Sequence, residues 1–137
     1  MRIWDRIIEI EELNNYAKGS MVEHIGLEFI EITDNSMIAR IPIDRHTKQP
    51  YGILHGGASA TLAETLASMA AQYVIPVDKK VVGIELNVNH LRQATEGWLT
   101  GIVTAIRIGR RVQVWDIRMS GDDGKEVSVA RLTTMVL

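Results

Sequence analysis

The sequence contains no cysteine among its 137 residues, which excludes disulfide bonds, thiol nucleophiles and thiolate metal sites. It also lacks an excess of basic charge: the formal net charge is −2, whereas a nucleic-acid-binding domain carries a strongly basic surface. Hydrophobic residues make up 46% of the chain and charged residues 23%, as in ordinary globular proteins. We therefore expect one globular domain over residues 1–137, with no nucleic acid as a partner.

The N-terminus lacks the uninterrupted apolar region of a signal peptide, because Asp5, Arg6 and Glu9 break it. The segment Gly56–Val77 is long enough to span a bilayer, but it carries regularly spaced polar residues and Pro76. We expect a buried helix there, no membrane partner, and a cytoplasmic protein. No internal repeat, low-complexity tract or linker is visible.

The same apolar segment predicts one long helix, from about Gly57 to Ile75, with small residues that let a sheet pack closely around it. Its only formal charge is Glu64. Polar residues recur at steps of three and four and form one stripe on the helix: Thr61, Glu64, Thr65, Ser68 and Gln72. Burying an ionised carboxylate is costly unless it is paired or its pKa rises, so Glu64 is a candidate functional group.

The rest of the chain favours a short helix and six extended segments. The helix is expected over Glu11–Lys18, and the strands over Leu27–Thr33, Ser36–Ile43, Val82–Asn89, Trp98–Ile108, Arg111–Met119 and Glu126–Val136. Two strands, a long helix and then an antiparallel run of strands indicate an α+β fold. One curved sheet covers only one side of a helix, so we expect a homo-oligomer rather than a monomer.

The start of the long helix is a candidate oxyanion site. Gly56 and Gly57 lie where helical amides have no intrahelical partner, and a glycine lets a substrate oxygen approach the backbone closely. A tight turn that needs glycine for steric reasons is the alternative. Gln49 can complete an oxyanion hole, because its amide donates without titrating. His55 can polarise a carbonyl or fix the loop, or it can be a structural histidine.

Glu64 is the candidate general base or nucleophile, and the alternative is a structural carboxylate bonded to a neighbour. Ser68, one turn further on, can hydrogen-bond Glu64 or hold a water against it. The sequence has no G-x-S-x-G motif, so a serine triad is poorly supported. No metal site is expected, because His24, His46 and His90 show no metal-ligand spacing.

Basic residues gather in the C-terminal half of the chain. They are His90, Arg92, Arg107, Arg110 and Arg111, and we expect the arginines of one hairpin to lie beside the first two on a neighbouring strand. Arginines bind phosphates bidentately, so the cluster can hold a phosphorylated ligand. A solvated hairpin face that balances acidic residues elsewhere is the alternative.

Taken together, these residues resemble the hotdog-fold acyl-CoA thioesterases of the 4-hydroxybenzoyl-CoA thioesterase type, which carry a glutamate on the central helix. The resemblance is carried by His46–Ser59, Leu62–Glu64 and Ser68, and it extends through Val82–Arg92, Ile108–Arg111 and Arg131–Thr134. Within that family the chain looks most like the 1,4-dihydroxy-2-naphthoyl-CoA hydrolases of menaquinone biosynthesis. It is also similar to the aryl-carrier proofreading thioesterases of enterobactin synthesis.

The resemblance implies a long central helix wrapped by a curved antiparallel sheet of five or six strands. It also implies that Glu64 attacks the thioester carbonyl or activates water, while Gly56 and Gln49 hold the carbonyl oxygen. His55 would lie beside the thioester, and Ser68 would position Glu64 or the water. In this family the site lies between two subunits of a dimer, commonly within a dimer of dimers.

For the substrate, the resemblance implies an acyl-CoA, with no metal or redox cofactor. Gly83 would lie beside the pantetheine, and the five basic residues would lie near the nucleotide and phosphates of CoA. Three other functions stay open: a thioesterase acting on a carrier protein, a non-catalytic acyl-CoA-binding module, and a dehydratase or hydratase. A glutamate rather than a histidine on the central helix argues against the last.

Overall fold

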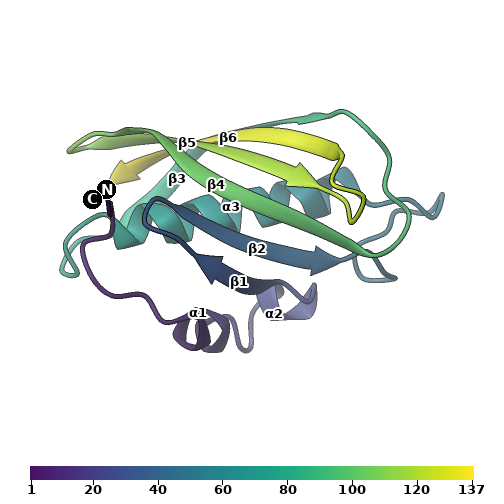
Figure 1. Ribbon diagram of the computed structural model, residues 1–137, viewed down its shortest axis with the longest axis horizontal. Helices are drawn as coiled ribbons and strands as arrows, with labels where there is room; N and C mark the ends of the chain where they lie inside the picture. Colours follow the sequence, from purple (N-terminus) through teal and green to yellow (C-terminus); the bar gives the residue numbers. More distant parts are fainter.

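The structure is a computed structural model that describes residues 1–137. In chain order its elements are α1 (Ile10–Tyr16), α2 (Met21–His24), β1 (Glu28–Ile32), β2 (Ser36–Pro42), α3 (Gly56–Tyr73), β3 (Val81–His90), β4 (Trp98–Ile108), β5 (Val112–Ser120) and β6 (Glu126–Val136). Figure 1 shows α3 lying lengthwise under the curved sheet, with α1 and α2 beside β1 and β2.

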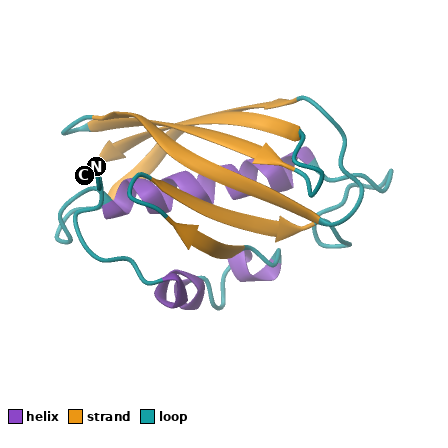
Figure 2. Ribbon diagram, in the orientation of Figure 1, coloured by secondary structure: helices purple, strands orange, loops and turns teal.

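The six strands form one sheet in the order β1-β2-β4-β5-β6-β3, and every neighbouring pair is antiparallel. The sheet curls around α3, as Figure 2 shows for the strands and helices coloured separately. The predicted α+β class and the long helix wrapped by an antiparallel sheet are therefore confirmed. No helix is both long enough and apolar enough to cross a membrane.

The core lies between α3 and the concave face of the sheet. One side of α3 is fully buried and consists of Leu62, Ala63, Leu66, Ala67, Ala70 and Ala71. Opposite it, the strands contribute large side chains such as Met37, Leu99 and Trp115, which are also inaccessible to solvent. The alanines let the helix approach the sheet, and each fully buried leucine contributes about 1.5–3 kcal/mol. The other side of α3, which carries the polar stripe, is only partly covered.

The N-terminal segment and the end of the long helix differ from the predicted ones. The helix α2 was not predicted, because it is a single turn whose only signal is the Ser20 cap, which accepts a hydrogen bond from the Val22 amide at 3.2 Å. The long helix ends at Tyr73, two residues earlier than predicted. Arg6 closes this end by donating to the Ile75 carbonyl at 3.1 Å and packing 4.3 Å over the Tyr73 ring.

The two edges of the sheet differ in whether another part of the chain covers them. At β1 the side chain of Asn14 pairs with both backbone groups of Phe29, at 2.8 and 3.1 Å, and so covers the edge. At β3 no element covers the outer edge, and Val82 and Ile84 are 42% and 51% exposed. Free strand edges are sites for pairing with another chain, so β3 is an unprotected edge beside the helix that carries Glu64.

Candidate active site

The start of α3 is built around His55, which is the N-cap residue with φ −72° and ψ 131°. Its Nδ1 accepts a hydrogen bond from the Gly57 amide at 2.7 Å. Because an accepting nitrogen carries no proton, the neutral ring is protonated at Nε2, which is left free to donate. The predicted role of His55 in fixing the loop is therefore seen directly, and its second nitrogen stays available.

The Gly56 amide has no hydrogen-bond partner in the chain. The amides of Ala58 and Ser59 both bond to the His55 carbonyl, at 2.9 and 3.4 Å, and leave Gly56 as the unpaired donor of the first turn. The absence of a side chain on Gly56 is also required sterically, because a Cβ would lie 2.8 Å from Nε2 of His90. The steric interpretation of this glycine is therefore seen in the structure, and the oxyanion interpretation stays a prediction that the free amide permits.

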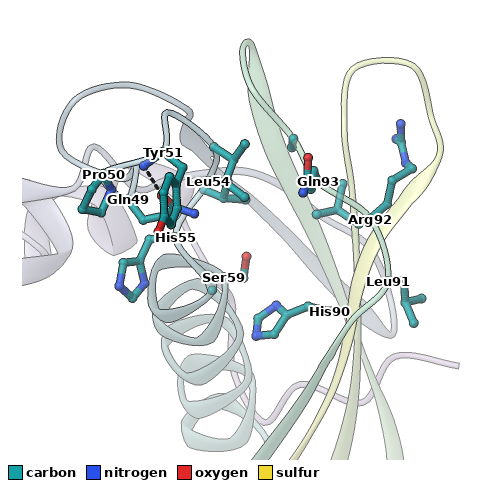
Figure 3. Close-up of a pocket in the computed structure, with 14 residues that line it drawn as sticks. Gln49, Pro50, Tyr51, Leu54, His55, Ser59, His90, Leu91, Arg92 and Gln93 are labelled. Carbon is teal, nitrogen blue, oxygen red and sulfur yellow. Dashed lines mark hydrogen bonds between the residues drawn. The ribbon is translucent and has the colours of Figure 1, made fainter.

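Gln49 is held with its amide group ready to donate. Its side-chain oxygen accepts a hydrogen bond from the Tyr51 amide, so the NH₂ group is turned away from the backbone without a partner in the chain (Figure 3). Its own backbone amide donates to the Ile53 carbonyl at 2.9 Å. The loop is further anchored by buried Thr47, whose carbonyl accepts a hydrogen bond from the His55 amide at 2.8 Å.

These groups open onto one cavity of about 620 Å³, which we call the helix-start cavity. Figure 3 shows Gln49, Tyr51 and His55 at one side of it, His90 approaching from β3, and Ser59 between them. Its wall consists of Gln49, Pro50, Tyr51, Ile53, Leu54, His55, Gly56, Ser59, His90, Leu91, Arg92, Gln93, Ala94 and Val127. The cavity thus brings together five of the predicted residues, namely Gln49, His55, Gly56, His90 and Arg92.

Glu64 lies elsewhere, two turns further along α3. Its carboxylate has no hydrogen bond or ion pair in the chain and packs against Gly83 of β3. Partial burial raises the pKa of Glu64 above its ordinary value of 4.5, since desolvation disfavours the charged form. An acid without a partner and with a raised pKa is typical of a functional group. The alternative, a structural carboxylate bonded to a neighbour, is not supported, because Glu64 makes no such bond.

Ser68 faces a second cavity of about 690 Å³, the mid-helix cavity, between α1, α3 and the start of β3. No hydrogen bond joins its side chain to Glu64, so the predicted positioning role is not formed within one chain. The wall of this cavity consists of Arg6, Glu12, Leu13, Tyr16, Thr65, Ser68, Met69, Gln72, Tyr73, Val77, Lys79, Lys80 and Val81.

The predicted catalytic residues therefore form two groups in one chain. Glu64 lies eight positions beyond Gly56 in the helix, which is about 12 Å along the axis. No side chain of one subunit bridges that gap to place a carboxylate at the free Gly56 amide. The arrangement across two subunits that the resemblance implies stays a prediction.

The predicted basic cluster is also divided, and its expected proximity within one chain is wrong. Arg107, Arg110 and Arg111 lie at the β4–β5 hairpin, where the Arg111 carbonyl accepts from the Val136 amide at 2.8 Å, opposite the start of β3. His90 lies at the other end of β3, about 30 Å away along the strand. The reason is the strand order, which places β5 and β6 between β4 and β3.

Two features of the site were not found from the sequence. Ser59 is 1% exposed, has no hydrogen bond from its hydroxyl, and lines the helix-start cavity. Asp123 holds Arg92 through a bond of 2.9 Å, and Arg92 also reaches the Lys125 carbonyl at 3.3 Å. The segment around Asp123 carried only a turn signal, so nothing in the sequence indicated this pair.

The histidines and acids do not converge anywhere in groups of three that could hold a metal ion. His24 and His46 form an edge-to-face pair with ring centroids 5.3 Å apart, away from the helix start. The chemistry open to the helix-start cavity is hydrogen-bond donation to an anion, from the Gly56 amide, the Gln49 side chain and Nε2 of His55.

Comparison with known proteins identifies the family of this chain. The sequence model of the thioesterase superfamily matches residues 51–128 of this chain. The 1,4-dihydroxy-2-naphthoyl-CoA hydrolase of Escherichia coli is 42% identical over 98% of this chain and 99% of its own length. The proofreading thioesterase EntH of Cronobacter turicensis is 39% identical over 98% of both chains.

Among solved structures, the Q49A mutant of the thioesterase PA1618 from Pseudomonas aeruginosa superposes with a TM-score of 0.98, with 43% identity over 98% of both chains. The family match covers more than half of the chain, and the likeness in sequence and structure extends over nearly all of it. The chain therefore belongs to the thioesterase superfamily, and it is a thioester hydrolase with the hotdog fold.

Proposed function

We propose that this protein hydrolyses an acyl-CoA thioester at a site shared by two copies of the chain. In each site one subunit supplies Glu64, and the other supplies the Gly56 amide and the Gln49 side chain. The observation that carries the proposal is that each group of residues lacks what the other has. The carboxylate of Glu64 has no polar partner in its own chain, and two unpaired donors face a cavity that contains no carboxylate.

The free edge of β3 supports the pairing of two copies. If two β3 strands pair antiparallel about a two-fold axis, the start of one strand lies beside the end of the other. Glu64, which packs against Gly83 near the start of β3, then approaches the partner's helix-start cavity beside its His90. The same operation brings the Arg110 hairpin of one chain toward Arg92 of the other, and so reunites the divided basic cluster.

In the proposed reaction the thioester carbonyl oxygen accepts hydrogen bonds from the Gly56 amide and Gln49. Donors placed in advance at a developing oxyanion contribute about 10²–10³ in rate each. Glu64 either attacks the carbonyl carbon or removes a proton from the attacking water. In both cases the C–S bond breaks, CoA leaves as the thiol after taking up a proton, and the acyl group leaves as the acid.

The two roles of Glu64 are separated by a single turnover in ¹⁸O-labelled water. A general base places the label directly in the acid product. A nucleophile forms a mixed anhydride, and attack of water on its Glu64 carbonyl places the label in the protein. No step needs a metal or a redox cofactor, and CoA takes part only as a portion of the substrate.

For the acyl group we propose an aromatic or medium-size chain held in the mid-helix cavity. The wall of this cavity begins at Thr65, directly after Glu64, and has apolar residues at Leu13, Met69 and Tyr73. The relative named 1,4-dihydroxy-2-naphthoyl-CoA hydrolase supports that aromatic substrate, and with it a role in menaquinone biosynthesis. The relative named proofreading thioesterase supports the alternative, an acyl group carried by a carrier protein.

The test is release of free thiol from a panel of aromatic and aliphatic acyl-CoAs by the parent protein and by Glu64→Ala. The variant should lose at least about 10³-fold in kcat, because the attacking group or its base is gone. Glu31→Ala is the matched control, since this glutamate lies exposed on β1, at the edge of the sheet opposite β3. Equal hydrolysis by Glu64→Ala and the parent defeats the assignment of Glu64.

The substrate carrier is tested with one acyl group presented on CoA and on a phosphopantetheinylated carrier protein. A higher kcat/KM on CoA supports the acyl-CoA assignment. A much higher kcat/KM on the carrier protein would identify the carrier protein, rather than CoA, as the natural carrier of the acyl group. The proposed role of Glu64 would be the same in both cases.

A further inference from the structure

The carboxylate of Glu64 occupies the space that a side chain at position 83 would need. A Cβ built on Gly83 would lie 2.5 Å from Oε1 of Glu64 and 3.4 Å from its carboxyl carbon. The third neighbour is a methyl group of Leu132, at 3.4 Å, which is an ordinary contact. Glu64 is therefore the residue that a side chain at this position would displace.

The backbone of β3 is irregular at the same place. Gly83 pairs with Thr134 and Glu85 with Thr133, so Ile84 is an extra residue in the strand. A bulge of this kind bends the strand locally and changes the direction of its side chains, and bulges are frequent beside active sites. Here it lies where the carboxylate crosses from the helix to the edge of the sheet.

Nothing polar in the chain determines the direction of Glu64. Ser68 is one turn away and makes no hydrogen bond to it, and no cation or amide lies within bonding distance. The direction of the carboxylate is therefore set by packing, and the close surface on the strand side is the bare Cα of Gly83.

We propose that Gly83 is a positioning residue for thioester hydrolysis, because its missing side chain lets Glu64 lie against the β3 bulge and extend toward the second copy. The inference rests on the proposed function. It gives Gly83 a role beyond the place beside pantetheine that the resemblance implies. The glycine acts through Glu64 and touches no reacting atom itself.

A methyl group at position 83 would move the carboxylate and spare the fold. To restore an ordinary contact, the oxygen must retreat from 2.5 to 3.4 Å, a shift of about 0.9 Å. The atom displaced is the free end of a flexible side chain, so the sheet and the helix need not shift. A misplacement of about 1 Å of a reacting group costs about 10²-fold in rate.

The experiment compares Gly83→Ala with the parent protein in three measurements. These are kcat for an acyl-CoA, the Kd of a non-hydrolysable acyl-CoA thioether, and the oligomeric state by light scattering. We expect kcat to fall by about 10²-fold with Kd and assembly unchanged. Glu31→Ala, an exposed substitution on β1 at the opposite edge of the sheet, should leave all three unchanged.

A second background tests whether the effect passes through Glu64. In a Glu64→Asp chain the shorter acid does not reach Gly83, so the alanine should cost no more than about threefold in kcat. The proposal is overturned if Gly83→Ala leaves kcat unchanged, or if it weakens thioether binding by the same factor by which it lowers kcat/KM. An equal loss of kcat in the parent background and in the Glu64→Asp background also overturns it.

The outcome is distinct from a failure of the proposed function. If Glu64→Ala retains full turnover, the catalytic assignment fails before Gly83 enters. If Glu64→Ala is inactive and Gly83→Ala is fully active, the function stands and the positioning role alone fails.

Discussion

The first turn and the middle of α3 differ in how their polar groups are satisfied. At the first turn the chain itself orders the groups: His55 caps the helix, Gln49 is held by the Tyr51 amide, and one amide is left free in a defined cavity. In the middle, Glu64 and Ser68 have no polar partner in the chain. The first turn therefore holds hydrogen-bond donors that the chain itself orders, whereas the middle of the helix holds a carboxylate and a hydroxyl without polar partners in the chain.

We propose that the two stretches are halves of one site, separated along the helix by about 12 Å. A single chain cannot close that distance, but a two-fold copy can place the end of one half against the start of the other. The free edge of β3 lies between them, whereas the opposite edge of the sheet is covered by Asn14. Damage to either half, in the same chain or in different chains, tests whether they act together.

The largest effect is expected when the two halves are damaged in different chains. A heterodimer of Glu64→Ala and Gln49→Ala subunits contains one site with both defects and one site with neither. It should regain about half of the parent activity, although the two variant homodimers are strongly impaired. Two affinity tags allow the heterodimer to be purified, and thiol release measures its turnover.

Its control is a heterodimer of Glu64→Ala with a Glu64→Ala, Gln49→Ala double variant, in which neither site is intact. This pair should stay inactive. If the first heterodimer is no more active than the mean of the two variant homodimers, the site is not shared between chains, and both groups of residues must act within one chain.

The next effect concerns the free amide at the helix start. In Gly56→Ala the new Cβ would meet the His90 ring at 2.8 Å, so the ring and the oxyanion pocket must rearrange. We expect kcat to fall by about 10²–10³-fold, the value of one oxyanion donor. Adding His90→Ala removes the clash, and it should recover part of kcat if crowding caused the loss. A Gly56→Ala variant with full kcat would show that this amide holds no oxyanion.

Much of the fold was predictable because its signals are local and strongly periodic. The extended patterns located the strands of the second half to within one residue, and the apolar run before Pro76 located α3. The helix α2 escaped because a single turn has too little periodicity to detect. The lone charge on α3 singled out Glu64, and its unpaired state in the structure agrees with that interpretation.

What escaped depends on strand order and on contacts between distant segments. The basic residues follow one another closely in sequence, but β5 and β6 separate β4 from β3, and the cluster is divided. Likewise, no pattern indicates that Gly83 must stay bare for a carboxylate 19 positions earlier in the chain, since that contact forms only when β3 lies over α3. Local chemistry was accessible from the sequence, and the pairing of distant groups was not.

A smaller effect is expected at the distant hairpin. Arg110 and Arg111 are exposed and make no ion pair in the chain, so they can approach a ligand phosphate. The double variant Arg110→Ala, Arg111→Ala should raise KM for an acyl-CoA by about tenfold with little change in kcat, because charge-assisted bonds to phosphate are lost.

The matched substrate is an acyl-pantetheine thioester without nucleotide or phosphates, for which KM should not change. If KM rises equally for both substrates, the hairpin does not recognise the nucleotide. His90, the last residue of β3, and Arg92 just after it lie far from this hairpin in one chain. His90→Ala and Arg92→Ala should show the same substrate dependence only if two copies bring these residues and the hairpin together.

The smallest effect is expected on thermal stability. It measures the cost of partly burying the Glu64 carboxylate, independently of any role of Glu64 in hydrolysis. Burial raises the pKa of Glu64, so the folded state binds this proton more tightly than the unfolded state. Above the raised pKa the fold therefore carries the cost of a partly desolvated charge, and this cost disappears as the pH falls toward the ordinary value of 4.5. Glu64→Gln removes the charge at every pH, so it should raise Tm by about 1–2 °C at pH 8 and by less as the pH approaches 4.5. Thermal unfolding followed by circular dichroism across this range measures the difference. A Gln variant that is less stable at pH 8 than at low pH, relative to the parent, would mean that the charge has found a partner, and that partner would have to come from outside the chain.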